Sequence, residues 1–213
     1  MKVVLVGATG FVGSHILKEL ISRGHEVIAV ARNVEQLEKV DGILPVQGDV
    51  TNVQTLAAII KGNDAVISAY NAGWANPNIY DDYTHGAKAI QEAVAQTEVK
   101  RLIVVGGAGS LLTAEGTRIV DDPAFPAAIK PGALAAADYY EVIKRNTDLD
   151  WSLFSPAIEL NDGPRKGKYR TGLDHPISDH EGHSTLSVAD AAVAIVDELE
   201  HPHFIKKRFT AAY

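Results

Sequence analysis

The chain has 213 residues, of which 46% are hydrophobic and 22% charged, and it carries a formal net charge of −7. This length and balance predict one soluble globular domain with a full core, and the acidic charge argues against a nucleic-acid-binding protein. The absence of cysteine excludes disulfides, thiol catalysis, iron–sulfur clusters and thiolate zinc sites. No secretion signal opens the chain and no apolar stretch approaches the roughly 18 residues of a membrane span, so we expect a cytoplasmic protein without a membrane partner.

The first functional motif is a glycine-rich turn between an apolar run and an amphipathic segment. Residues 3–6 are all apolar and mostly β-branched, which predicts a short strand buried on both faces. Residues 14–21 place apolar side chains at helical spacing, which predicts a helix. A strand, a glycine turn and a helix in this order present main-chain N–H groups and the positive end of the helix dipole to a phosphate.

The glycines of this turn are spaced G-x-x-G-x-x-G and have separate expected roles. Gly7 permits the tight turn, Gly10 lets a pyrophosphate come close, and Gly13 lets the helix pack on the strand. The spacing resembles the opening of the short-chain dehydrogenase/reductase superfamily, particularly its extended and atypical branches. The residues predicted to contact a dinucleotide here are Gly7, Thr9, Gly10, Phe11, Val12 and Gly13. A glycine turn without a ligand is the alternative, and the flanking strand and helix argue against it.

Arg32 follows the second predicted strand, residues 26–31, at the position that selects the cofactor. An acidic side chain there binds the ribose hydroxyl of NAD, whereas an arginine accommodates the additional phosphate of NADP. Arg32 therefore favours NADP, with NAD still possible, and a solvated arginine at a strand end is the alternative. A short helix is expected over residues 34–40 and a third strand over residues 43–48.

Two further strand ends carry candidate cofactor contacts. Asp49 and Val50 follow the third strand, and in the superfamily an aspartate–hydrophobic pair at this point flanks the adenine. Asp49 is equally suited to a turn, because aspartate readily bonds the nearby main chain. The fourth strand begins at residue 64 and leads into a loop where Ala69, Tyr70 and Asn71 resemble the superfamily segment beneath the nicotinamide ribose.

The remaining elements alternate between helix and strand. Helices are predicted from residue 51, over 79–97, from 131 to about 147 and from 187, and strands over 100–105, 151–155 and 205–210. This alternation predicts an α/β fold, a doubly wound parallel sheet of Rossmann type. Ligands of such sheets lie at the carboxyl ends of the strands, where all of the candidate contacts above are found.

Later segments resemble the NADH–flavin reductase family, a compact atypical branch of the same superfamily. The matching segments are residues 104–111, 150–157, 186–192 and 207–210, so that the resemblance covers the whole chain. It implies a single NAD(P)-binding domain, residues 1–213, in which residues 156–185 form a small, irregular substrate lobe towards the C-terminus. Gly106 and Pro156, which lie in these segments, complete the predicted cofactor contacts. The implied activity is hydride transfer to a flavin or quinone-like acceptor.

The usual catalyst of the superfamily is a Tyr-x-x-x-Lys pair with a nearby serine, in which the lysine lowers the pKa of the tyrosine. Tyr140 and Lys144 have this spacing, and Ser110 supplies a hydroxyl in the loop after the fifth strand. The register that fits the sixth strand instead aligns Ala133 and Ala137 with the pair, so the sequence favours a coincidence on the helix surface. Ser110 is equally suited to cap a turn.

The missing acid–base pair bears on the choice of function. A flavin or quinone accepts a hydride directly while water supplies the proton, so such an acceptor is favoured. A non-catalytic NADP-sensing protein is the main alternative, and a nucleotide-sugar epimerase or dehydratase, which needs the tyrosine, is disfavoured. His175, His180 and His183 lie among acidic residues, but their spacing matches no metal motif and no metal is expected. We therefore predict an NAD(P)H-dependent reductase with a small-molecule acceptor; the sequence predicts no oligomeric state.

Overall fold

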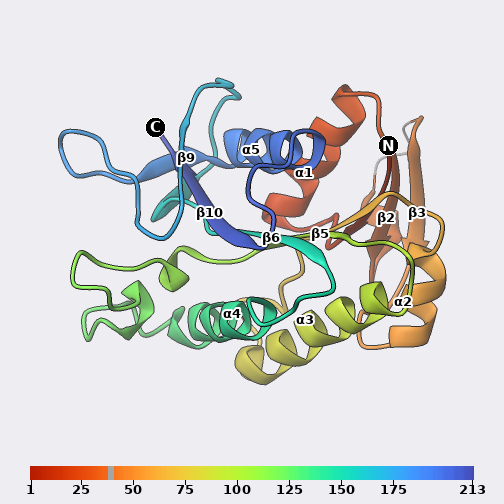
Figure 1. Cartoon of the computed structure of the whole chain (residues 1–213), viewed down its shortest axis with the longest axis horizontal. Helices are drawn as coiled ribbons and strands as arrows, with labels where there is room; N and C mark the ends of the chain where they lie inside the picture. The colour runs from red at the N-terminus through yellow and green to blue at the C-terminus, as the bar shows by residue number, and fades with distance from the viewer. Residues whose placement is uncertain (38–40) are drawn as a thin grey trace.

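An eight-stranded sheet runs through the middle of the part of the chain that the computed structural model describes, residues 1–37 and 41–213 (Figure 1). In spatial order its strands are β3 (Ile43–Gln47), β2 (Glu26–Ala31), β1 (Lys2–Val6), β4 (Ala65–Ser68), β5 (Arg101–Val105), β6 (Asp150–Phe154), β10 (Lys207–Ala212) and β8 (Arg170–Gly172). Neighbouring strands are parallel from β3 to β10, and β8 adds to β10 in the antiparallel direction. The predicted doubly wound parallel sheet is confirmed.

Helices cover both faces of this sheet (Figure 1). On one face α1 (Phe11–Ser22) packs against α5 (Val188–Glu200). On the other face α3 (Ile79–Ala95) packs between α2 (Val53–Ile60) and α4 (Lys130–Ile143). The crossover helices therefore bury the sheet from both sides, which is why its strands are almost continuously apolar.

The first strand shows how one apolar run serves two cores. Val3 and Leu5 of β1 belong to the core that also contains the apolar side chains of α1 and α5. Val4 and Val6 belong to the core shared with α2, α3 and α4. Successive side chains of a strand point to opposite faces, so burial on both faces requires this unbroken apolar run.

Several helices differ from their predicted extents. Helix α1 begins at Phe11 instead of residue 14, and α2 begins at Val53 instead of residue 51. The helix expected over residues 34–40 is a single 3₁₀ turn, Val34–Gln36, and residues 38–40 lie outside the described part of the chain. Helix α3 ends at Ala95 instead of residue 97. Helix α4 ends at Ile143 instead of near residue 147, because the Asn146 side chain accepts hydrogen bonds from the main-chain N–H groups of the next residues and closes a turn there.

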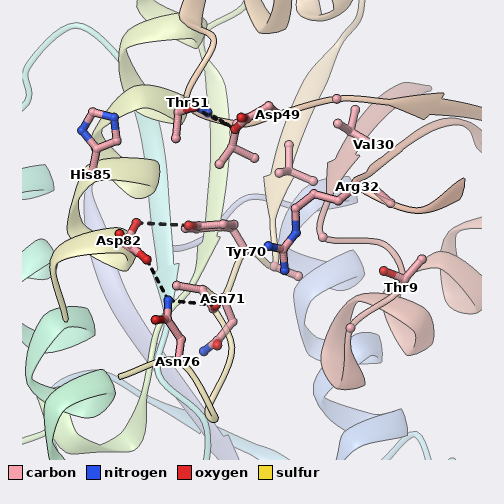
Figure 2. Close-up of a pocket in the computed structure, with 18 residues that line it drawn as sticks. Thr9, Val30, Arg32, Asp49, Thr51, Tyr70, Asn71, Asn76, Asp82 and His85 are labelled. Atoms are coloured by element: carbon pink, nitrogen blue, oxygen red, sulfur yellow. Dashed lines mark hydrogen bonds between the residues drawn. The ribbon is translucent and has the colours of Figure 1, made fainter. Parts of the chain in front are cut away.

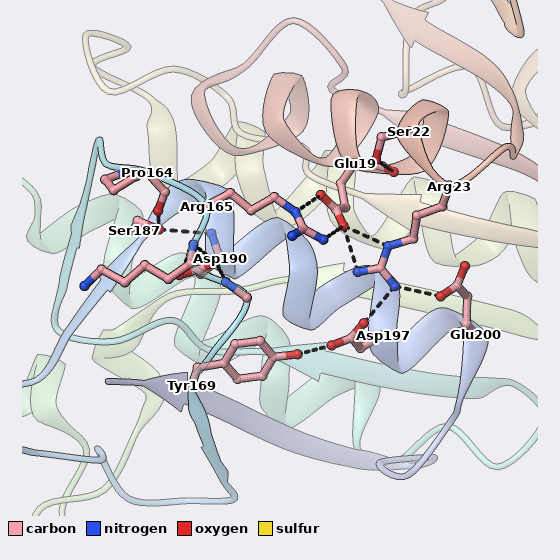
Figure 3. Close-up of polar contacts among 12 residues, drawn as sticks. Glu19, Ser22, Arg23, Pro164, Arg165, Tyr169, Ser187, Asp190, Asp197 and Glu200 are labelled. Carbon is pink, nitrogen blue, oxygen red and sulfur yellow. Dashed lines mark hydrogen bonds and ion pairs between the residues drawn. The ribbon is translucent and has the colours of Figure 1, made fainter.

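Residues 156–185, which we call the lobe, contain more regular structure than expected. Strand β7 (Glu159–Asn161) pairs in parallel with β9 (Thr185–Ser187), and β8 extends the main sheet. The buried carboxylate of Asp190 in α5 accepts hydrogen bonds from the main-chain N–H groups of Lys166 and Gly167, the shortest at 2.7 Å (Figure 3). The lobe is thereby attached to the start of α5.

A second attachment joins the lobe to α1. Arg165 donates two hydrogen bonds of 2.8 Å to the buried carboxylate of Glu19, and Arg23 donates a third of 2.8 Å to the same group (Figure 3). The hydrogen bond from Arg165 is the main reason that the pKa of Glu19 lies below its ordinary value, against the opposing effect of burial. An acid on the inner side of α1 is therefore stabilised by a partner far away in the sequence.

Replacing Glu19 with glutamine is expected to lower the free energy of unfolding by about 1–3 kcal/mol at neutral pH, because two guanidinium groups lose an ionised acceptor. Since the pKa of Glu19 is lowered by folding, the carboxylate contributes fully above the ordinary value of 4.5 and loses its contribution as the pH falls through the lowered pKa. Urea unfolding should show the gap between the two proteins shrinking on acidification. Glu115→Gln, a change at an exposed loop position, is the matched control, and a pH-independent gap would contradict the prediction.

Candidate dinucleotide-binding site

A pocket of about 430 Å³ opens at the carboxyl ends of β1, β2, β3 and β4 (Figure 2). The predicted cofactor residues that line it are Gly7, Thr9, Gly10, Arg32, Asp49, Val50, Ala69, Tyr70 and Asn71. Phe11, Val12 and Gly13 follow as the first turn of α1, whereas Gly106 and Pro156 follow β5 and β6 and are not lining residues. The structure therefore brings together most of the predicted contacts from four separate segments.

The three glycines of the turn occupy different environments. Gly7 has a positive φ of 82°, and a Cβ there would lie 2.6 Å from the main-chain oxygen of Ala69. A Cβ at Gly13 would lie 2.0 Å from the Gly7 oxygen, so the helix packs on the turn only with glycine. Gly10 is extended, with φ −75° and ψ 169°, and its Cβ would meet only the Gly7 oxygen, at 3.3 Å. Gly10 is thus the glycine whose missing side chain leaves space open to a ligand.

The N-terminus of α1 has the features of an anion site. No side chain caps it, its first turn carries no acidic residue, and Gly10 is the N-cap. Among the described residues, none accepts a hydrogen bond from the main-chain N–H of Phe11, Val12 or Gly13. Unpaired amides at the positive end of a helix bind phosphate, so the turn fits the diphosphate of a dinucleotide.

Arg32 extends from the end of β2 into the pocket (Figure 2). The Gln47 side chain donates a hydrogen bond to the Arg32 carbonyl, which ties this main chain to β3. None of the ion pairs formed within residues 1–37 and 41–213 uses the Arg32 guanidinium. Its charge is therefore available to an anionic ligand.

Asp49 lines the pocket and also makes the turn that its residue type allows. One oxygen of its carboxylate accepts hydrogen bonds from the main-chain N–H and the hydroxyl of Thr51, at 2.9 and 2.8 Å (Figure 2). These two bonds lower the pKa of Asp49. The turn that the sequence left open for Asp49 is thus present, and it fixes an ionised side chain at the wall of the pocket; the contact with adenine stays a prediction.

Tyr70 forms another wall of the pocket. Its ring lies against α3 at Gly86, where a Cβ would come within 2.5 Å of it, and stacks on Tyr83 with 6.0 Å between centroids. The hydroxyl donates a hydrogen bond of 3.1 Å to the carbonyl of Asp82, and burial raises the pKa of Tyr70. Tyr70 is therefore a protonated, well-supported surface next to the glycine turn.

Nine lining residues were not predicted from the sequence, among them Asn76 in the loop after β4 and Asp82 and His85 in α3. Asn76 donates a hydrogen bond of 2.8 Å to the Asp82 carboxylate, which joins the loop after β4 to the first turn of α3 (Figure 2). Asp82 and His85 are three positions apart and so share one face of α3. That spacing is visible in the sequence, but which face of the helix meets the pocket is not.

Ser110, the predicted catalytic serine, is buried after β5. Its hydroxyl donates a hydrogen bond of 2.9 Å to the carbonyl of Gly107 and lies 2.8 Å from the Ser155 hydroxyl. It is not a pocket-lining residue. These contacts match the turn-capping role that the sequence left open.

Tyr140 and Lys144 lie towards the C-terminal end of α4, outside the pocket lining. The Tyr140 ring packs edge-on to Trp151 at the start of β6, with the Arg208 guanidinium 4.4 Å from its centroid. Burial raises the pKa of Tyr140, whereas catalysis in the superfamily needs it lowered. Lys144 pairs with Glu141 at 2.6 Å. This geometry agrees with the helix-surface interpretation of the pair.

Ala133 and Ala137 occupy the register that the sequence aligned with the catalytic pair. Both are buried with Val120, a residue of the loop between β5 and α4. Methyl groups at these positions supply packing and cannot move a proton.

Within the described ranges, no group of three histidine, aspartate or glutamate side chains lies close enough together to hold a metal ion. None of the helices described is both long and apolar enough to cross a membrane.

The fold and the pocket define a Rossmann-type dinucleotide-binding protein. The chain belongs to the NAD(P)H-binding family, whose model matches residues 7–202. The matched region begins at the first glycine of the turn and includes every residue of the pocket except Val6. The resemblance stated from the sequence motifs is thereby confirmed at the level of the family.

Three proteins match this chain over almost its whole length. The uncharacterized protein YwnB of Bacillus subtilis is 36% identical over 213 residues, which cover 99% of this chain and 97% of YwnB. A Bacteroides thetaiotaomicron structure, described provisionally as an epimerase, is 41% identical with a TM-score of 0.93 over 100% of this chain and 96% of its own. A Streptococcus pneumoniae structure, described provisionally as an NADH-flavin reductase, is 34% identical with a TM-score of 0.88. The match covers 100% of this chain and 99% of that structure's chain.

Proposed function

We propose that this protein is an NADPH-dependent reductase that transfers a hydride to a flavin or quinone-like acceptor. The observation that carries the proposal is a nucleotide pocket with an open glycine turn and an Arg32 that forms no ion pair with residues 1–37 or 41–213, while Tyr140 and Lys144 do not line it. When bound, a reduced nicotinamide supplies two electrons as hydride, and the acceptor takes up that hydride together with one proton from water. The chain's own contribution is then binding and orientation.

Each part of the pocket has a separate expected role. The free amides of α1 hold the diphosphate, and Arg32 holds the additional phosphate of NADP. Asp49, kept ionised by Thr51, faces the adenosine portion, and Tyr70 and Asn71 border the nicotinamide side. The assignment of NADP over NAD depends on Arg32 alone.

A panel of acceptors tests the reductase activity. The purified protein is mixed with NADPH and, in turn, riboflavin, FMN or menadione, and loss of the reduced-nicotinamide absorbance is followed. Turnover that requires both the protein and an acceptor supports the proposal. Tight NADPH binding without turnover of any acceptor would instead favour an NADP-sensing protein, which the position of Tyr140 and Lys144 outside the pocket lining also suits.

Tyr140→Phe separates this mechanism from that of a classical short-chain dehydrogenase. We expect unchanged turnover, because the ring packs between Trp151 and Arg208 outside the pocket, and phenylalanine keeps that packing. If Tyr140 were the proton donor, turnover would fall by about 10²- to 10⁴-fold. Steady-state rates at saturating NADPH decide between the two, with thermal unfolding as the check that the variant is folded.

A further inference from the structure

We propose that the indole of Trp74 is the surface on which the planar ring of the acceptor stacks. This inference rests on the reductase function proposed above and names the acceptor side of the same site. Trp74 is 60% exposed, the largest of the exposed apolar side chains in the described part of the chain. An exposed indole offers a planar apolar face on which an aromatic ring can stack.

The indole is rigidly supported from below by the first turn of α4. A Cβ at Gly132 would lie 2.8 Å from an indole carbon of Trp74 and 2.7 Å from the side chain of Ile79. Glycine at this position therefore lets the ring lie directly on the helix backbone. One part of the ring is supported and the rest remains open to solvent, which is the arrangement that stacking requires.

The loop that carries Trp74 is also a wall of the nucleotide pocket. Asn71 and Asn76 line the pocket on either side of it in the sequence. The Asn71 side chain accepts a hydrogen bond of 2.7 Å from the N–H of Gly73, and the N–H of Asn76 donates one of 2.9 Å to the Gly73 carbonyl. Trp74 is thus held by a closed turn at the border of the pocket, where a hydride acceptor must meet the cofactor.

Three more exposed apolar side chains follow neighbouring strands, and we call the set Phe11, Trp74, Ile129 and Ile158 the apolar rim. They are 50%, 60%, 42% and 53% exposed. They lie in the connections that follow β1, β4, β5 and β6, four strands that are neighbours in the sheet. Connections after neighbouring parallel strands lie at one edge, so the rim faces the carboxyl side of the sheet as the pocket does.

The composition of the rim selects the class of ligand. A flavin or quinone is planar and electron-accepting, and gains from an aromatic and aliphatic surface. A nucleotide sugar would instead need hydrogen-bond donors and acceptors where these side chains stand. The rim therefore favours a planar ring acceptor over the sugar substrate of an epimerase.

The kinetic test uses riboflavin as the acceptor. Trp74→Ala is expected to raise the KM for riboflavin by about tenfold, the effect of one lost stacking contact, while the Kd for NADPH stays the same. Gly132→Ala keeps the indole but displaces it, and should also raise the KM for riboflavin. Trp74→Phe keeps an aromatic ring, and its KM should lie close to that of the unaltered protein. Leu44→Ala removes a side chain of similar exposure, 58%, from β3 and is the matched control. Thermal unfolding checks that each variant is folded.

A binding test that needs no turnover distinguishes this inference from the proposed function. The chain has two tryptophans, and Trp151 is buried, so quenching by a stacked ligand reports mainly on Trp74. Riboflavin titrated into protein saturated with NADP⁺ should quench the emission in a saturable way, and Trp74→Ala should lose that response. Saturable quenching without reduction of any acceptor would support the stacking site and refute the reductase. Reduction with an unchanged KM in Trp74→Ala, or no saturable quenching, would overturn the stacking site.

Discussion

Gly10→Val is expected to weaken binding of NADPH by about 100-fold or more while changing the stability of the protein little. Gly10 already has an extended conformation that valine adopts readily, and a Cβ there meets a single main-chain atom at 3.3 Å. Its methyl groups, however, would fill the space in front of the free amides of α1. Each charge-assisted hydrogen bond lost at the diphosphate costs about 1.5–3 kcal/mol, so the loss of two accounts for the expected effect.

Isothermal titration calorimetry with NADPH and urea unfolding together measure this result. Gly13→Ala is the contrasting variant, because its Cβ would lie 2.0 Å from the Gly7 oxygen. It should lower the free energy of unfolding by about 1–3 kcal/mol, through overpacking of the helix against the turn. If Gly10→Val bound NADPH like the unaltered protein, the diphosphate would not lie at the start of α1, and the functional proposal would fail.

Arg32→Asp is expected to reverse the preference between the two nicotinamide cofactors. Removing the guanidinium and placing a carboxylate at the end of β2 should weaken NADPH binding by about 100-fold, since a charge-assisted contact becomes a repulsion. NADH, which lacks the additional phosphate, should bind as well or better, because an acidic side chain there accepts from the ribose hydroxyl. Calorimetric titration of both cofactors gives the ratio of the two Kd values directly.

Arg145→Asp is the matched control for this substitution. Arg145 is an exposed residue just beyond the end of α4, so the variant carries the same change of net charge away from the pocket. Its ratio of Kd values for NADPH and NADH should equal that of the unaltered protein. An equal loss of both cofactors in Arg32→Asp would show that Arg32 supports the pocket in general and does not recognise the additional phosphate.

The sequence by itself determined the parts of this protein whose signals are local. The first strand, the glycine turn and the first helix follow one another within about 20 positions, and periodicity and glycine spacing predicted all three, although α1 begins at Phe11 instead of residue 14. The place of Arg32 directly after the second strand was predictable for the same reason, and its role towards the cofactor stays a prediction. The alternation of elements and the right-handed crossover predicted a doubly wound parallel sheet, whereas the order of its strands comes from the structure.

Only the tertiary structure decided which distant residues meet. The spacing of Tyr140 and Lys144 satisfies a local motif, but the packing of α4 on the sheet carries both outside the pocket, next to Trp151. Conversely, Asp82 and His85 carry no motif and line the pocket because α3 presents that face to the loop after β4. The sequence period of a helix shows which of its faces is apolar. Which element each face contacts depends on how the helices pack across the sheet.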